Sequence, residues 1–441
     1  METQLPYILG RQNPIGQPFS EIDVNSALEA ISANFKEAWL KKDEHHPLQI
    51  LWKRKDALST IELFTLGRAI LLLSEIDPRW VKYQVDLSRG NDANNRRGAL
   101  FELLSACFLS TNSQKVVPAR INQKGFDVTV RLHTGNTFNL SIKNHGYSYH
   151  HEEFRRRSRT FEIKLREGMK PRKFYWLQVF IEFNNGYPNP GDWANLERYF
   201  PSFLDEYKGD VAHSRCGEWS ISLSDRKSPG DLFHTRYNSY TFVVTSSFHK
   251  NENQNLISKL DQASNNLEKH GPHETQDSIN MVYFRVPQDV SLENCISWGK
   301  QYFCEKHNSP ISGVLFYQPS VVYSDGKHFI AHYSLPVISD NFIKWKARSG
   351  AIPAMSFPVG VVCNQLPANH LTDGKALLSI IKEKYLYQSG KHFMEVSPDC
   401  SGGFSGNLSR PGPGIHQYSV FTIDDNDVIL QGRFGDELLI L

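Results

Sequence analysis

The sequence predicts an α/β fold: a mixed central sheet flanked by helices, with a helical N-terminal region and a β-rich C-terminal region. Three observations predict it. Strand-like and helix-like segments alternate through the middle of the chain, a short hairpin has one apolar and one polar face, and the N-terminal part has only helical spacing. The alternating segments are a strand at 240–248, a helix at 251–271, a strand at 279–286, a helix near 291–306 and a strand at 311–318.

Length and composition limit the class of protein. With 441 residues, 40% apolar and 12% aromatic, the chain has the composition of two or three globular domains. A net charge of +2 indicates no partner by itself, and the six cysteines form no C-x-x-C pair, which argues against a zinc ribbon and suits a reducing, cytoplasmic setting. The N-terminus shows no secretory signal, and the apolar helix at 61–76 is too short to span a membrane.

The first region, residues 1–87, is expected to be helical. Apolar residues recur at helical spacing from Glu21 to about Ile76, with a break at 43–47, which predicts two or three helices. A polar loop then ends at Asn94 or Asn95, either of which is a plausible N-cap for the helix 96–109.

The rest of the chain divides into a core at 88–335 and a β-rich region at 336–441. An aromatic strand is expected at 174–183, and either it or the strand at 240–248 would complete the sheet that begins with the hairpin. A second hairpin is expected at 321–335 with its turn at Asp325 and Gly326, and a long loop at 398–414.

The first hairpin occupies two alternating runs, 126–132 and 138–143. Each run has one apolar and one polar face, so the two apolar faces must coincide. A three-residue loop, Thr134-Gly135-Asn136, satisfies this requirement, with Gly135 or Asn136 at positive φ.

This register places Asp127 opposite Lys143 and Thr129 opposite Ser141. Opposed Cβ atoms lie roughly 4.5–5.5 Å apart and diagonal ones about 7–8 Å apart, so Asp127, Ser141 and Lys143 can converge on one small object. A surface ion pair between Asp127 and Lys143 on a half-exposed sheet is the alternative interpretation.

Glu102 lies upstream, within the apolar segment ALFELLSACFL. A carboxylate on such a helix is costly to bury alone and must reach water, a cation or a metal. The alternative is that Glu102 occupies a narrow exposed stripe of its helix.

A helix with an inward Glu, a strand with Gly-Phe-Asp, a tight turn and a strand ending in x-Ile-Lys follow one another over about residues 96–147. This order resembles the catalytic core of the PD-(D/E)XK nuclease superfamily, which has a restriction-endonuclease-like fold. Ser141 departs from the family pattern, because an Asp or Glu usually stands there.

The resemblance implies a Mg²⁺ (or Mn²⁺) site. Glu102 and Asp127, with the Ile142 carbonyl as a further candidate, would hold the ion, and Lys143 would activate or position the attacking water. With Ser141 in the motif, the site uses fewer anionic ligands, another acid substitutes, or catalysis is lost.

Two acids just past the hairpin, Glu152 and Glu153, are the candidates for that substitution, although acids at a helix N-terminus are the more ordinary interpretation. The nearby histidines His145, His150 and His151 would contact phosphate, assist proton transfer or lie on the surface. Gln178 is a polar residue within an apolar strand. Its side chain either points toward the metal site or forms its hydrogen bonds at a sheet edge or in the core.

Positive charge is concentrated at 155–173, where nine Lys and Arg face two acids, a local charge of +7 against −5 for the remainder. Such a patch favours a nucleic-acid backbone, although a solvated helix face is the alternative. The candidate nucleic-acid-binding residues are Arg96, Arg97, Arg155, Arg156, Arg157 and Arg159.

The function predicted from these features is a Mg²⁺-dependent DNA endonuclease, acting on double-stranded DNA in restriction or phage defence. Partners other than DNA would be a second copy of the chain or a defence-system protein, with no membrane involved. The alternatives are a decayed nuclease-fold module that binds nucleic acid or a protein, and an interaction scaffold with a structural Asp127–Lys143 pair. No Walker A loop or G-x-S-x-G elbow competes with these interpretations.

Overall fold

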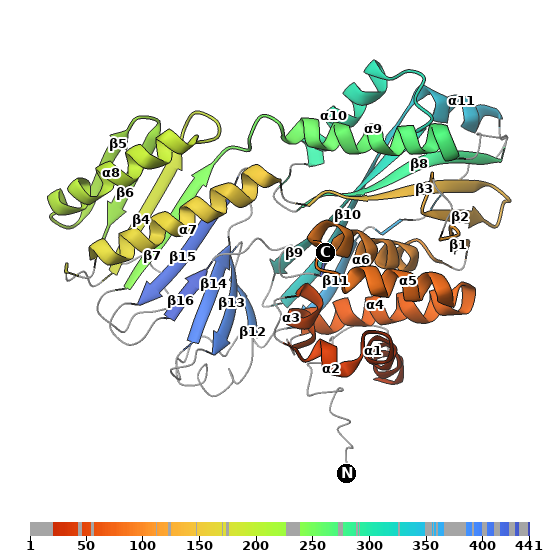
Figure 1. The fold of residues 1–441 in the computed structure, drawn as a ribbon, viewed down its shortest axis with the longest axis horizontal. Helices are drawn as coiled ribbons and strands as arrows, with labels where there is room; N and C mark the ends of the chain where they lie inside the picture. Colours follow the sequence, from red (N-terminus) through yellow and green to blue (C-terminus); the bar gives the residue numbers. More distant parts are fainter. Residues whose placement is uncertain are drawn as a thin grey trace, which may run out of the picture.

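The computed structural model describes residues 21–365 with short gaps, five later strands, and Ile440 and Leu441. The gaps are 43–45, 54–56, 112, 122–124, 147, 170, 173–175, 226–238, 272–276, 288–289, 291, 325–326, 349–354, 356 and 359. The later strands are β12 (Tyr385–Ser389), β13 (His392–Pro398), β14 (Phe404–Ser409), β15 (Ile415–Thr422) and β16 (Val428–Gln431). The fold is mixed α/β, as expected, with helices packed on two larger sheets (Figure 1).

The N-terminal region is helical, as expected, and continues farther than the pattern indicated. Its helices are α1 (Glu21–Phe35), α2 (Glu37–Leu40), α3 (Pro47–Lys53), α4 (Ala57–Ile76), α5 (Pro78–Ser88) and α6 (Ala93–Phe108). The predicted caps Asn94 and Asn95 are wrong, because the side chain of Asp92 accepts the Asn95 N–H at 2.7 Å and α6 begins directly after it.

The first sheet has seven strands in the order β1-β2-β3-β8-β9-β10-β11. They are β1 (Gln114–Pro118), β2 (Val128–Leu132), β3 (Thr137–Asn144), β8 (Ser278–Arg285), β9 (Gly313–Ser324), β10 (Lys327–Ile338) and β11 (Gly360–Gln365). Neither candidate strand, 174–183 or 240–248, joins it. The neighbour of β3 is β8, which runs parallel to it after α9 (Glu252–His270), as a crossover helix requires.

Helices cover both faces of this sheet. The N-terminal helices form one hydrophobic core with β2 and β3, and α9 with α10 (Leu292–Glu305) forms another on the opposite face. Phe101 of α6 stacks on Tyr283 and Tyr317, with ring centroids 5.2 and 5.8 Å apart. Because β3 is central and covered on both sides, Asn139 and Ser141 of its polar face are buried and not half-exposed.

The turn of the first hairpin differs from the predicted loop, Thr134 to Asn136. Leu132 donates its N–H to the carbonyl of Asn136 at 2.9 Å, so the loop consists of His133, Thr134 and Gly135. Gly135 has the positive φ, 91°, that such a loop needs.

The register is therefore shifted by two residues. Thr129 pairs with Asn139, where the predicted partner was Ser141. The shift keeps each side chain on its face, since the side-chain period of a strand is two. It brings Asp127 beside Ser141 and removes the directly opposed pairing of Asp127 with Lys143.

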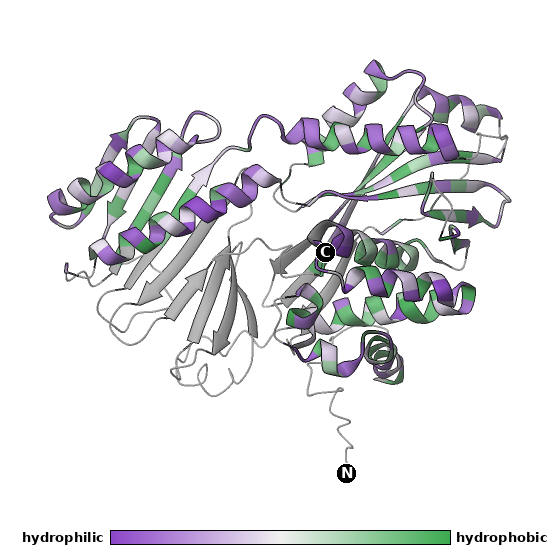
Figure 2. Cartoon of the chain, in the orientation of Figure 1, coloured by the Kyte–Doolittle hydropathy of each residue, from purple (hydrophilic) through white to green (hydrophobic). Residues whose placement is uncertain are grey.

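A second sheet, in the order β16-β15-β7-β4-β6-β5, lies in the other lobe (Figure 1). Four of its strands come from the segment between β3 and α9: β4 (Trp176–Phe183), β5 (Val211–Cys216), β6 (Trp219–Ser224) and β7 (Ser239–Ser246). Helices α7 (Tyr149–Met169) and α8 (Pro190–Glu206) pack on one face through a hydrophobic core. The visible side of α7 is largely hydrophilic (Figure 2).

The later part of the chain contributes strands to both sheets. The expected hairpin is present as β9 and β10, which pair from Ser324 and Lys327 outward, while its turn lies outside the described residues. The expected long loop at 398–414 is wrong, because it contains β14, which pairs with β13. Helix α11 (Asp340–Arg348) follows β10, and none of the described helices has the length and apolar content that a bilayer span needs.

Candidate active site

Asp127 lies just before β2, where the side chains on either side of it point to opposite faces of the sheet. Phe126 packs with the α9 core and Val128 with the core of the N-terminal helices, so the side-chain direction switches around Asp127. Gly125 makes this possible, because it has φ of 111° and a Cβ there would lie 2.8 Å from the Gly271 nitrogen at the end of α9.

One carboxylate oxygen of Asp127 lies close to three polar groups of β3. Its Oδ2 accepts the N–H of Ile142 at 2.6 Å and lies 3.5 Å from the Ser141 hydroxyl and 3.9 Å from the Lys143 ammonium. The side chains of Asp127 and Lys143 are 30% and 23% exposed, so a substrate can reach both. Ile142 contacts the carboxylate through its N–H, and a metal-binding role of its carbonyl stays a prediction.

Glu102 of α6 is half-buried and faces this cluster. The Gln84 amide donates to its Oε2 at 2.5 Å. The pKa of Glu102 is raised to about 8, mainly by burial and also by the Asp127 carboxylate, while Lys143 and the Gln84 hydrogen bond oppose the rise. Glu102 is therefore largely protonated at neutral pH and lies within electrostatic reach of both hairpin residues.

The pattern of the sequence did not reveal Gln84. It lies on the buried face of α5, which otherwise consists of Trp80, Val81, Val85 and Ser88. Its Oε1 is buried and has no hydrogen-bond partner among the described residues. The feature of the sequence that could have indicated it is a single amide side chain on an otherwise largely apolar helix face.

The residues present fit a hard cation with oxygen ligands. Mg²⁺ needs only one or two carboxylates together with water and phosphate oxygens, and Glu102 and Asp127 meet that minimum. The orphaned Gln84 oxygen adds a neutral ligand atom in the same cluster. The described residues hold no group of three or more His, Cys, Asp or Glu side chains that would form a larger metal site.

A second lysine approaches from α9. Lys259 donates to the Asn144 carbonyl at 2.5 Å, directly after Lys143 in the chain. The pKa of Lys259 is lowered to about 8, mainly by burial and also by the positive charges of Lys143 and Arg285. No local pattern indicates this lysine, because 115 residues separate it from Asn144.

The three histidines do not lie on the surface as a group. His145 and His151 are buried, at 4% and 1% exposure, and burial with the nearby cations lowers the pKa of His145 to about 3. His145 is therefore neutral and suited to packing, not to binding phosphate. His150 stacks on His249 with ring centroids 3.5 Å apart.

Neither downstream acid supplies the carboxylate that Ser141 lacks. Glu153 binds Arg156 and Arg157, both at 2.7 Å, and Glu152 lies in the first turn of α7. Gln178 belongs to β4, in the second sheet, and so lies outside the cluster around Asp127.

The predicted basic residues divide between two places. Arg155, Arg156 and Arg159 line an open groove of about 430 Å³ on α7. Arg97 lies beside Gly146, just past β3, and burial together with Arg97 lowers the pKa of Arg96. The groove therefore has the excess of cations that a phosphate backbone requires.

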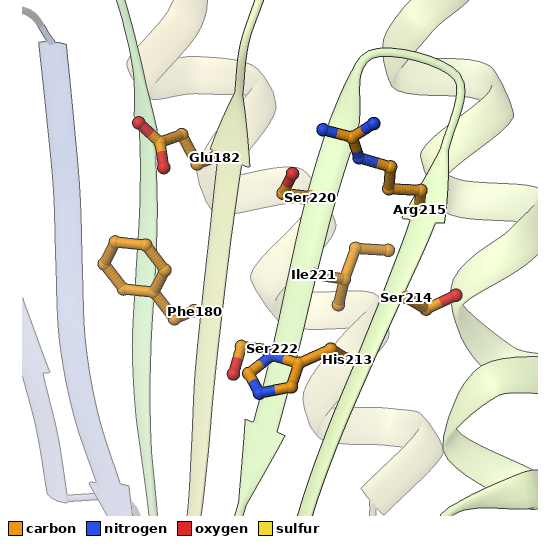
Figure 3. Close-up of a pocket in the computed structure, with 8 residues that line it drawn as sticks. All are labelled: Phe180, Glu182, His213, Ser214, Arg215, Ser220, Ile221 and Ser222. Carbon is orange, nitrogen blue, oxygen red and sulfur yellow. The ribbon is translucent and has the colours of Figure 1, made fainter.

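A second hollow, of about 360 Å³, lies on the sheet face opposite α8 (Figure 3). Its two charged side chains have opposite signs and no ion pair in the described part of the chain, so it offers no excess of positive charge to a polyanion. The outward-facing residues are Phe180, Glu182, His213, Arg215, Ser220 and Ser222.

The cluster thus unites side chains from α5, α6, the start of β2, and β3. Glu102 and Gln84 approach from the helical side, and Asp127 and Lys143 from the hairpin. Comparison of the sequence with models of known protein families and with curated protein sequences found no match.

Proposed function

We propose that this protein is a Mg²⁺-dependent nuclease that hydrolyses DNA phosphodiester bonds at the cluster of Glu102, Asp127 and Lys143. The observation that carries the proposal is the meeting of two carboxylates and an accessible lysine. Lys143 lies 3.9 Å from Asp127, and both influence the pKa of Glu102. Perturbed acids beside a specific charge partner at an accessible position are typical of catalytic sites.

The order of elements supports the same proposal. A helix bearing Glu102, three antiparallel strands, a crossover helix and a fourth strand parallel to the third follow one another as α6, β1, β2, β3, α9 and β8. This resembles the core of the PD-(D/E)XK superfamily, with most of the second lobe inserted after β3. Such an insertion leaves the parallel pairing of β3 and β8 intact.

Each residue has a distinct task in this chemistry. A bound Mg²⁺ would supply Lewis acidity at the phosphoryl oxygens and the leaving group. Asp127 and ionised Glu102 would hold the ion. The Lys143 ammonium, fixed beside Asp127, would orient the attacking water and stabilise the negative charge that develops on the phosphoryl group.

Substrate binding is assigned to the cationic groove of α7, with Arg97 beside the site. The Arg155 and Arg159 side chains line that groove, and Glu153 orders Arg156 and Arg157 through hydrogen bonds. Double-stranded DNA is the proposed substrate, and restriction or phage defence in the cytoplasm is the setting that the family resemblance implies.

A nucleic-acid-binding module without cleavage is the second candidate. Ser141 favours it, because a neutral hydroxyl replaces the motif acid and no described acid takes its place. The basic groove would serve either function.

Plasmid cleavage with Mg²⁺ distinguishes the two candidates. The wild type should nick supercoiled DNA, and Asp127→Asn and Lys143→Met should each reduce the rate by at least about 100-fold, in line with the loss of a general acid-base group. Lys115→Met, an exposed lysine of β1, is the matched control and should cleave normally. Equal rates in all four proteins would refute the site, and tight DNA binding with no cleavage by the wild type would establish the binding module.

A further inference from the structure

The side-chain amide of Gln84 makes a hydrogen bond through its nitrogen but not, within the described part of the chain, through its oxygen. Gln84 is 3% exposed, and while its Nε2 donates to Glu102, its Oε1 has no hydrogen-bond partner among the described residues. A buried acceptor left without a partner destabilises the folded state, because it has lost its hydrogen bonds to water. Such a group in a native protein calls for an explanation, which a bound ion, a water molecule or a catalytic role can supply.

The ionised form of Glu102 fixes the direction of this amide. A carboxylate only accepts hydrogen bonds, so the Nε2–H group of Gln84 must face it. The amide oxygen, on the same amide carbon, is then free of this hydrogen bond and lies beside the same carboxylate.

Compared with the PD-(D/E)XK motif, the cluster has one acid fewer. Ser141 stands where the motif has an acid, and its hydroxyl lies 3.5 Å from Asp127 Oδ2, a long contact for a hydrogen bond. Amide carbonyl oxygens bind hard divalent cations alongside carboxylates and water. One unused oxygen and one missing motif acid therefore occur in the same cluster.

We infer that Gln84 Oε1 is a ligand of the divalent cation and replaces the acid that is absent at position 141. The inference rests on the proposed function and goes beyond it by assigning a helix residue to the metal shell. The ligand set becomes Glu102, Asp127 and Gln84, with the remaining positions open to water and phosphate.

A purely positioning role, in which Gln84 only orients Glu102, is the competing explanation. Titration calorimetry with MgCl₂ at pH 8.5 and without DNA first tests whether Gln84 has either role, and a double variant then separates the two. Gln84→Leu should weaken Mg²⁺ binding by about 10- to 100-fold. Gln49→Leu is the matched control, because Gln49 is a buried helix glutamine that donates to the Trp39 carbonyl at 2.9 Å, and it should bind as the wild type does.

The double variant Gln84→Leu with Ser141→Asp gives the decisive result. If Gln84 is a ligand, the new carboxylate should restore the affinity to within about threefold of the wild type. Continued weak binding by the double variant would assign Gln84 to positioning and overturn the inference, as would wild-type affinity in Gln84→Leu. If Gln84→Leu does not fold, Gln84→Met, which keeps the side-chain shape, takes its place. Absence of Mg²⁺ binding by the wild type would instead count against the proposed function.

Discussion

The pKa of Glu102 predicts that protons and Mg²⁺ compete for the site. Its carboxyl has a pKa of about 8 in the folded protein, so the acid form predominates below that pH. A cation requires the ionised form and must displace the proton. The apparent affinity for Mg²⁺ should therefore rise with pH and level off above about pH 8.5.

The size of the rise follows from the pKa. A group with a pKa of about 8 is roughly 3% ionised at pH 6.5 and about half ionised at pH 8, because each pH unit changes the ratio of the two forms tenfold. Apparent Mg²⁺ affinity should increase about 15-fold between these values. Glu102→Gln should bind the ion more weakly and lose most of the pH dependence.

Isothermal titration of the metal-free protein at four pH values between 6.5 and 8.5 measures this rise. Glu29→Gln, an exposed acid of α1, is the control and should keep the wild-type profile. A wild-type affinity that changes less than twofold across the range would contradict proton competition at Glu102, and a steep profile in Glu102→Gln would show that another group titrates.

Three further predictions concern folding. Without metal, the folded state retains the Glu102 proton between about pH 4.5 and 8, whereas the unfolded chain releases it. The melting temperature should therefore fall as pH rises through this window, and Glu102→Gln should reduce the fall. Phe101→Ala should cost about 3–5 kcal/mol in urea unfolding, since it removes the ring stacked on two buried tyrosines, and a loss below 1 kcal/mol would contradict that packing. Gly125→Ala should lower both the melting temperature and the Mg²⁺ affinity, because the added methyl group displaces Asp127. The control Gly98→Ala has open space around its added Cβ and should be neutral or stabilising by up to about 1 kcal/mol. Equal effects of the two substitutions would contradict the role given to Gly125.

Local patterns predicted which residues of the hairpin share a face but not which residues pair across the two strands. Alternation identified the two faces of the hairpin, yet a slip of two residues preserves both faces, and only the turn distinguishes the registers. In the structure Asn136 closes the turn with Leu132, which moves the pairing and brings Asp127 beside Ser141.

Residues brought in by tertiary packing escaped prediction. Glu102 was identified because an acid within an apolar helix needs a partner, and the structure supplies one in Gln84, 18 residues earlier. Lys259 reaches Asn144 only because α9 crosses back after the inserted lobe. The strand β8 was expected, but the same insertion hid its pairing with β3, since it comes more than 130 residues later in the chain.

The proposed chemistry requires that Glu102 and Asp127 share a divalent cation. Crystals soaked in MnCl₂ at pH 8.5 and measured at the manganese absorption edge test it directly. We expect an anomalous peak within bonding distance of both carboxylates, and its absence from Asp127→Asn crystals. A fully occupied peak elsewhere, or none between the two carboxylates at saturating Mn²⁺, would contradict it.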